Sequence, residues 1–259
     1  MKKWRFIPLK IRNGLWNLAL DEAILEAVIQ KKSPYTIRFY KWNPSTASIG
    51  RNQSLKDEVE EDFCNKRGFN IVRRITGGGA VFHDSKREIT YSLVCSIRFL
   101  EKRDAYKVLE QFELINQGII EALNMYGLES EKGIIHCPAI FLDGKKFSGN
   151  AQARRKGYLL QHGTILLKID PNLMYSVLKT PPHVSKNKMV RSVRAKCVGV
   201  QDKIQNYEEK EFMNFLKNGF EKIFQIDLQE GDFSDYELNL AKRLIEEKYS
   251  KDNWLRKYE

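Results

Sequence analysis

The sequence predicts an α+β fold in which mixed, mostly antiparallel sheets are flanked by helices. Strand-like and amphipathic helical stretches are interspersed, hairpin signals join some strands, and the chain becomes more helical from about residue 171. With 42% hydrophobic residues, the composition is that of a globular protein. We therefore expect a single domain over residues 1–259 with a more helical C-terminal part.

The first expected elements alternate between helix and strand. Leucine and alanine at near-helical spacing predict a helix over residues 14–30, and aromatic and β-branched residues predict a strand over 35–42. An Asn-Pro-Ser-Thr turn at 43–46 separates this strand from a short one at 47–50. A helix over 56–67 follows and ends before a glycine.

The middle of the chain contains most of the expected strands. Apolar and β-branched stretches predict them near 69–74, 79–83, 89–97, 134–142, 145–150 and 157–169. Asp143-Gly144 lies between two apolar runs and is typical of a two-residue hairpin turn. Apolar stripes predict a long helix over 104–126, and further helices are expected near 172–178, 207–223 and 235–248.

The net charge of +11 indicates a surface that attracts acidic partners, such as nucleic acid, a nucleotide phosphate or an acidic carrier protein. No RNA-binding, zinc-finger or helix-turn-helix signature occurs, so we expect no nucleic-acid partner. No apolar run approaches the roughly 20 residues that span a bilayer, and no secretion signal is evident. We therefore expect a cytoplasmic protein without a membrane partner. The four cysteines form no CxxC pair, and we assign no metal ligands.

The most informative stretch is a glycine loop within residues 73–84. Its sequence is Arg-Arg-Ile-Thr-Gly-Gly-Gly-Ala-Val-Phe-His-Asp. Three consecutive glycines allow positive φ angles and a close approach to a ligand, and their N–H groups can form an anion-binding nest. The two arginines supply donors suited to a phosphate or carboxylate. The spacing matches neither a Walker A loop nor a Rossmann fingerprint.

Three ordered blocks resemble the signatures of lipoate–protein ligases, which share a superfamily with biotin–protein ligases. The first block is the glycine loop, the second runs from Asp143 to Gln152, and the third covers residues 160–166. Weaker similarities extend from Asn17 to Ser250. Because the blocks occur in the family's order and cover nearly the whole chain, the chain is identified as a member of this superfamily.

The resemblance implies roles for the residues at matching positions. Lys146 matches a lysine that touches the acyl carbonyl and the phosphate in the family, and it is the expected catalytic residue. Lys145 is expected to face solvent from the other side of a strand. By itself, His162 would more often be a hydrogen-bonded core histidine than a ligand-binding residue, and its place in the third block weighs against that interpretation. The residues expected to bind the acyl-adenylate or substrate are Arg73, Arg74, Gly77, Gly78, Gly79, Ala80, Val81, His83, Gly149, Ala151, His162, Gly163 and Thr164.

The resemblance implies a lipoate–protein ligase, and we expect this function. Such an enzyme activates lipoate or octanoate with ATP and Mg²⁺. It then attaches the acyl group to the acceptor lysine of a lipoyl carrier domain, of the glycine-cleavage H protein or 2-oxoacid dehydrogenase E2 type. We expect no counterpart of the family's small C-terminal accessory domain, and a separate accessory subunit is therefore a candidate partner if the protein is a ligase.

One departure from the ligase pattern supports an alternative. Ligases usually carry an Asn-Asp pair where this chain has Pro138 and Ala139, which supply no carboxylate for a nucleotide or its metal. Cys137 lies directly before them, and ATP-independent octanoyltransferases of the superfamily use a cysteine in this region as an acyl-carrying nucleophile. Cys137 is a site residue only in that case. The intact triple glycine favours the ligase. Biotin–protein ligase, a nucleic-acid-binding module and a non-catalytic carrier-binding protein are more distant alternatives.

Overall fold

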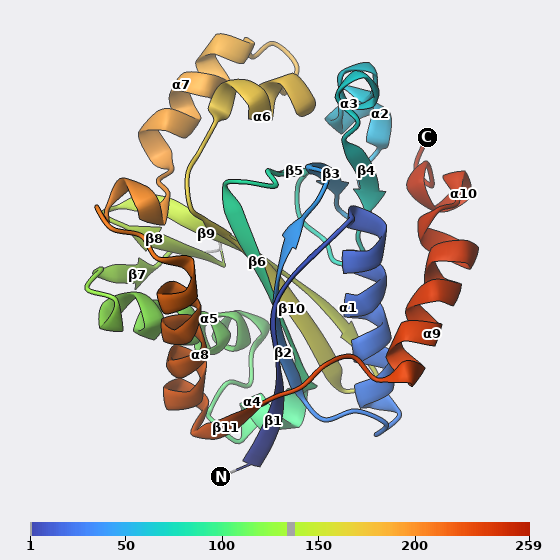
Figure 1. Ribbon diagram of the computed structural model, residues 1–259. Coiled ribbons are helices and arrows are strands. Elements are labelled where there is room, and N and C mark those ends of the chain that lie inside the picture. The colour runs from blue at the N-terminus through green and yellow to red at the C-terminus, as the bar shows by residue number, and fades with distance from the viewer. Residues whose placement is uncertain (1, 134–137) are drawn as a thin grey trace.

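The computed structural model describes residues 2–133 and 138–259 and has the expected mixed α+β architecture (Figure 1). The strands are β1 (Lys2–Arg12), β2 (Thr36–Trp42), β3 (Thr46–Ile49), β4 (Asn70–Arg73), β5 (Val81–His83), β6 (Glu88–Ser96), β7 (Ser130–Lys132), β8 (Ala139–Leu142), β9 (Lys145–Arg155), β10 (Tyr158–Leu166) and β11 (Ile226–Glu230). The helices are α1 (Gly14–Ile29), α2 (Leu55–Glu58), α3 (Glu61–Arg67), α4 (Ile97–Glu101), α5 (Val108–Met125), α6 (Pro171–Val177), α7 (Lys186–Lys196), α8 (Glu209–Phe224), α9 (Asp235–Leu244) and α10 (Asp252–Leu255). A 3-10 turn spans Val200–Asp202, and a π-helical turn, Ile245–Tyr249, extends α9.

The strands form two sheets. In the described part of the chain, the main sheet has the order β11-β1-β2-β6-β10-β9-β8-β7, and the smaller sheet has the order β4-β3-β5. Pairing is parallel from β11 through β1 to β2 and between β3 and β4, and it is antiparallel elsewhere. The expectation of mixed, mostly antiparallel sheets is therefore confirmed.

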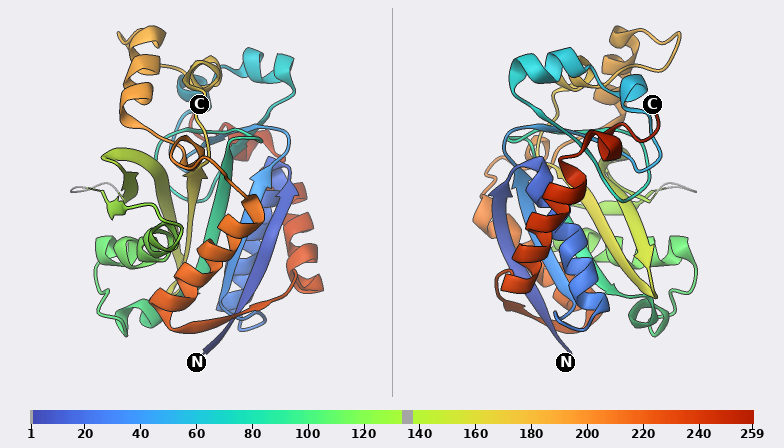
Figure 2. Two further views of the ribbon diagram at one scale, coloured as in Figure 1. Left: turned by 60° about the vertical axis from the view of Figure 1, so that its left-hand side comes forward. Right: turned by 90° about the vertical axis from the view of Figure 1, so that its right-hand side faces the viewer.

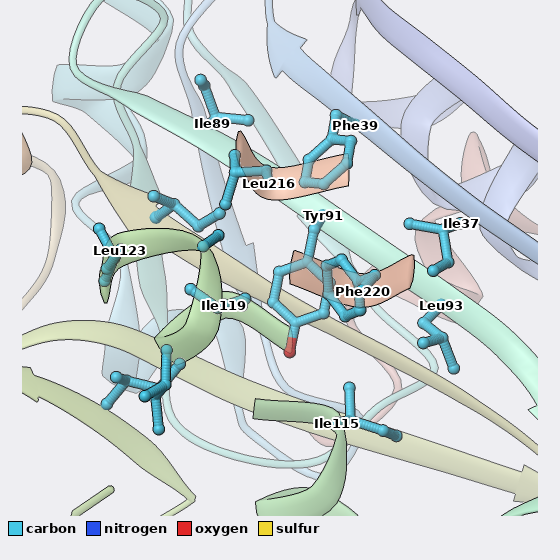
Figure 3. Packing of buried hydrophobic residues seen from close by; sticks show 14 of the residues in the cluster. Ile37, Phe39, Ile89, Tyr91, Leu93, Ile115, Ile119, Leu123, Leu216 and Phe220 are labelled. Atoms are coloured by element: carbon cyan, nitrogen blue, oxygen red, sulfur yellow. The ribbon is translucent and has the colours of Figure 1, made fainter. Parts of the chain in front are cut away.

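Helices cover both faces of the main sheet (Figures 1 and 2). α1 and α9 pack on one face, and α5 and α8 pack on the other. On the second face, Phe39 and Tyr91 of the sheet meet Ile119 of α5 and Phe220 of α8 (Figure 3). Full burial of such a side chain contributes roughly 1.5–3 kcal/mol. This packing holds β2, β6 and β10, the strands that carry much of the site.

Some elements differ from the sequence-based expectation. The expected helix at 56–67 is divided into α2 and α3. β1, β7, β11, α4, α7 and α10 were not expected. β1 mixes basic with apolar residues, so its strand character depends on long-range pairing with β2 and β11. At the β8–β9 hairpin, Asp143 (φ 50°) and Gly144 (φ 67°) adopt the left-handed conformations that the sequence predicts.

The segment after residue 170 contributes to three parts of the molecule. α6 and α7 lie together at the top of Figure 1, next to α2 and α3. α8 and β11 then return to the main sheet, and α9 packs on α1. No helix among the described residues is long and apolar enough to cross a membrane.

Candidate active site

A cavity of about 310 Å³ lies between the glycine loop, β9, β10 and α6. Its polar wall comes from the glycine loop and from β9 and β10, whereas Leu18, Trp42, Leu166, Met174 and Leu178 supply apolar surface. Such a cavity can hold a hydrocarbon chain with a polar reacting group at one end. The expected site residues that line it are Arg74, Gly78, Gly79, Ala80, Val81, His83, Lys146, Gly149, Ala151, His162, Gly163 and Thr164.

Among the described residues, two of the expected site residues, Arg73 and Gly77, do not line the cavity. Arg73 is 1% exposed, and its guanidinium donates to the carbonyl oxygens of Gln53 and Leu255, each at 2.6 Å. It therefore ties the smaller sheet to α10 instead of facing the cavity. Gly77 presents its carbonyl oxygen to Arg74. Cys137 lies outside the described residues.

Arg74 binds carbonyl groups of the glycine loop. Its Nη2 donates to the carbonyl oxygens of Gly77 (2.8 Å) and Gly79 (2.7 Å), and its Nη1 donates to the carbonyl of Ser48 (3.0 Å). Burial lowers the pKa of Arg74 to about 10, so the guanidinium stays charged at neutral pH. Arg74 therefore fixes the loop, and its donors are directed at backbone carbonyls.

The amide groups of Gly77, Gly78 and Gly79 donate no hydrogen bond to any other described residue. Gly78 adopts φ 92°, the conformation for which a glycine is needed. Arg74 donates to the carbonyl groups of the loop, and the N–H groups of the three glycines remain free to donate to an electronegative atom of a ligand. The loop can therefore polarise a carbonyl or hold an anion.

A buried hydrogen-bond chain connects α1 to Arg74. Asp21 Oδ2 lies 3.0 Å from His162 Nδ1, and His162 Nε2 lies 2.8 Å from the hydroxyl of Thr76. The Nε of Arg74 donates to the same hydroxyl at 3.1 Å. Because a carboxylate only accepts, we assign the proton to Nδ1, so that Nε2 accepts from Thr76. The chain orients Arg74 and, through it, the glycine loop.

Burial and charge set the protonation states in this chain. Burial raises the pKa of Asp21, but Arg38, His162 and Ser92 outweigh that effect, and the net shift is downward. Burial lowers the pKa of His162 despite its bond to Asp21. The pair is therefore an ionised carboxylate and a neutral imidazole at neutral pH. His162 both lines the cavity and is a hydrogen-bonded core histidine.

Lys146 and Lys145 face opposite ways, as the strand alternation of β9 predicts. Lys146 lines the cavity, and a Cβ atom placed on Gly149 would lie 3.4 Å from its Nζ. Lys145 is exposed to solvent. Within the described residues, the Lys146 ammonium has no hydrogen bond or ion pair. A cation free to meet a ligand can stabilise negative charge that develops on an acyl carbonyl oxygen.

Gly163 and Asn150 meet too closely for any side chain at position 163. A Cβ atom on Gly163 would lie 1.9 Å from Asn150 Oδ1 and 2.8 Å from the ring of Tyr91. Asn150 is fixed in turn: Tyr91 donates to its Oδ1 at 2.7 Å, and its Nδ2 donates to the carbonyl of Pro138 at 2.7 Å. This contact sets the wall of the cavity near Pro138.

Several lining residues, such as Trp42 and Thr90 near the expected residue His83, were not anticipated. His83 stacks on Trp42 at 4.0 Å between ring centroids, and its Nδ1 lies 2.7 Å from Glu88 Oε1. The indole of Trp42 donates to Thr90, which donates to Glu88. Trp42 and Thr90 lie on strands that the sequence predicts, but no motif marks which face of those strands meets the site.

The described cysteines are poorly activated. Burial raises the pKa of Cys64 to about 11, and it raises the pKa of Cys95 further. Cys197 lines the cavity, and burial raises the pKa of its thiol although Lys146 opposes this. Thiolate nucleophiles require a lowered pKa, so these three thiols are unsuited to that role.

Comparisons with known proteins identify the family. The family described as Lipoyl protein ligase A/B catalytic domain matches residues 13–221. The chain therefore belongs to this family. Octanoyltransferase LipM of Anoxybacillus flavithermus is 35% identical, with 97% of each chain covered, and its Bacillus subtilis counterpart is 34% identical with the same coverage. A bipartite lipoate protein ligase from Thermoplasma acidophilum has a similar structure, with TM-score 0.86, 29% identity, and 99% of this chain and 97% of that chain covered.

These relatives correct the functional expectation. The interpretation as an ATP-dependent lipoate–protein ligase is wrong, because eight curated relatives that are 31–35% identical over nearly the whole chain are octanoyltransferases. They support the alternative interpretation. The physical reason lies at the start of β8, where Ala139 is 1% exposed and, like Pro138, offers no carboxylate to a nucleotide or metal.

Proposed function

We propose that this protein is an octanoyltransferase that transfers an octanoyl group from a thioester donor to the acceptor lysine of a lipoyl carrier domain. The reaction passes through a thioester on Cys137 and requires neither ATP nor Mg²⁺, because the donor is already activated. The observation that carries the proposal is the chain-long similarity to octanoyltransferases. The acceptor is a lipoyl domain of the glycine-cleavage H protein or 2-oxoacid dehydrogenase E2 type.

The chemistry consists of two acyl transfers. The Cys137 thiolate attacks the donor carbonyl, a new C–S bond forms, and the C–S bond of the donor thioester breaks, so that the donor's thiolate leaves and takes up a proton. The amine of the acceptor lysine then attacks the enzyme thioester. A C–N bond forms, the bond to Cys137 breaks, and the amine proton returns to the cysteine. In both steps the carbonyl oxygen gains negative charge, which Lys146 and the free amides of the glycine loop stabilise.

Three features support this assignment of roles. The described cysteines have raised pKa values, which disfavours them as nucleophiles. The chain at Pro138, directly after Cys137, is held to the cavity residue Asn150. The apolar surface from Trp42, Leu166 and Met174 suits an eight-carbon acyl chain.

The test is octanoyl transfer to a purified lipoyl domain, followed by intact mass spectrometry. One reaction contains an octanoyl thioester without ATP, and the other contains lipoate, ATP and Mg²⁺. We expect octanoylation in the first reaction with the unaltered protein and none with Cys137→Ser. Modification only in the ATP-dependent reaction, unaffected by Cys137→Ser, would refute the proposal.

A further inference from the structure

Helix α7 carries a concentration of positive charge beside the cavity. No acidic residue occurs between Asp170 and Asp202, a segment that contains six lysines and arginines. Five of the six lie on α7, and all five are exposed: Lys186, Lys188, Arg191, Arg194 and Lys196.

These charges are not neutralised within the described part of the molecule. Lys186 donates to the hydroxyl of Ser176, and the other four basic residues of α7 form no ion pair or side-chain hydrogen bond there. Val190 is the one residue of α7 that is buried, and it anchors the helix with its apolar neighbours Met189 and Val193. The remaining surface of the helix is therefore basic and open to a partner.

A second, polar cavity of about 320 Å³ lies between α7 and the start of α6 and adjoins the candidate active site at Cys197. Arg87 and Arg194 line it, and Cys197 lines both this cavity and the acyl cavity. Its carboxylates are engaged: Asp170 lies 3.8 Å from Arg87 and accepts from the amide of Leu173, and Asp202 accepts from the amide of Gly199. Arg194 is thus the lining cation with no partner among the described residues.

The backbone after α7 leads directly to the catalytic lysine. Cys197 forms a β-bridge with Lys146, and the amide of Val198 donates to the carbonyl of Lys146 at 3.1 Å. A flexible arm that runs from Arg194 past Cys197 would therefore bring its end close to Lys146. A phosphate on such an arm would meet the guanidinium of Arg194.

We propose that α7 is the docking surface for the acyl donor, a small acidic carrier protein whose octanoyl thioester is held on a phosphate-bearing arm. The protein part binds the exposed cations of α7, and Arg194 receives the phosphate. This inference rests on the proposed octanoyltransferase activity. Charge complementarity selects an acidic partner, and the adjoining polar cavity selects the donor arm over the acceptor lysine, which carries no phosphate.

The test measures loading of the enzyme from three donors: octanoyl carrier protein, octanoyl-CoA, which has the same arm without the protein, and octanoyl-N-acetylcysteamine, which lacks the phosphate. Lys188→Glu/Arg191→Glu should raise KM for the carrier protein about tenfold, with an effect that shrinks at high salt. It should leave the two small donors within twofold. Arg194→Gln should raise KM about tenfold for both phosphate-bearing donors and not for the third.

The matched control is Lys242→Glu/Arg243→Glu, which reverses two exposed charges on α9. It should behave like the unaltered protein with every donor. If the α7 and α9 variants had the same KM for the carrier protein, the role of α7 as docking surface would be overturned. The proposed octanoyltransferase activity would not be affected by that result. If none of the three donors transferred an octanoyl group to the unaltered protein, the proposed function itself would be overturned.

Discussion

The glycine loop and α7 lie near the same cavity but are built in opposite ways. Around the loop, a buried hydrogen-bond chain links Asp21, His162, Thr76 and Arg74. On α7, the cations are exposed, and four of the five lack a partner among the described residues. A buried network fixes geometry, whereas exposed charge acts over roughly a Debye length of about 10 Å at moderate salt. The first arrangement suits catalysis and the second suits partner capture.

The largest effect is expected at the cation inside the cavity. Lys146→Ala should reduce octanoyl transfer roughly 100- to 1,000-fold, because a preorganised charge opposite the carbonyl oxygen is lost. Lys145→Ala is the matched control, since its side chain is exposed on the other face of β9. Single-turnover kinetics measure both variants. Equal activity of the two would contradict the role assigned to Lys146.

The rigid wall of the site should respond to an added methyl group. Gly163→Ala places a Cβ atom 1.9 Å from Asn150 Oδ1, so we expect a loss of about 1–3 kcal/mol in the free energy of unfolding. Gly77→Ala is the control, because nothing lies within 4 Å of its Cβ position and its φ is not positive. Urea denaturation distinguishes them. An unchanged midpoint for Gly163→Ala would show that the wall can relax.

The buried histidine predicts a pH dependence of stability. Burial lowers the pKa of His162 in the folded protein, whereas the unfolded chain titrates near 6.5. Below that value the unfolded state binds the extra proton, so stability decreases as the pH falls, by at most about 1.4 kcal/mol per pH unit from this group. His162→Gln should lack this component between pH 6.5 and 5. Parallel stability curves for the two proteins would contradict a neutral, buried His162.

The smallest effect is expected at the cysteine that lines the cavity. Cys197→Ser should retain octanoyl transfer within about threefold, because burial raises the pKa of its thiol and keeps the thiolate scarce. The assay is ATP-free octanoylation of a lipoyl domain. If Cys197→Ser were inactive and Cys137→Ser active, the nucleophile would be Cys197 and not Cys137.

Much of the fold and most of the cavity-lining residues could be predicted from the sequence. α1, β2, β6, α5 and the Asp143-Gly144 hairpin follow from periodicity and turn chemistry, and the three motif blocks identify most of the cavity-lining residues. The alternation along β9 correctly separates Lys146 from Lys145. These features depend on local spacing, which a single sequence records.

Long-range features could not be predicted in the same way. Arg73 and Arg74 are neighbours with the same chemistry, yet one ties down α10 and the other holds the glycine loop. Asp21 and Trp42 reach the site only because α1 and β2 pack there. α7 was missed because only one of its residues is buried, which leaves a weak apolar pattern.

The most direct test of the central claim is the mass of the enzyme itself after incubation with an octanoyl thioester and no ATP. We predict one octanoyl adduct on the unaltered protein, released by hydroxylamine, absent in Cys137→Ser and passed to a lipoyl domain when that domain is added. If the unaltered protein transfers octanoyl groups but never carries one, or if the adduct persists in Cys137→Ser, the thioester mechanism at Cys137 is contradicted.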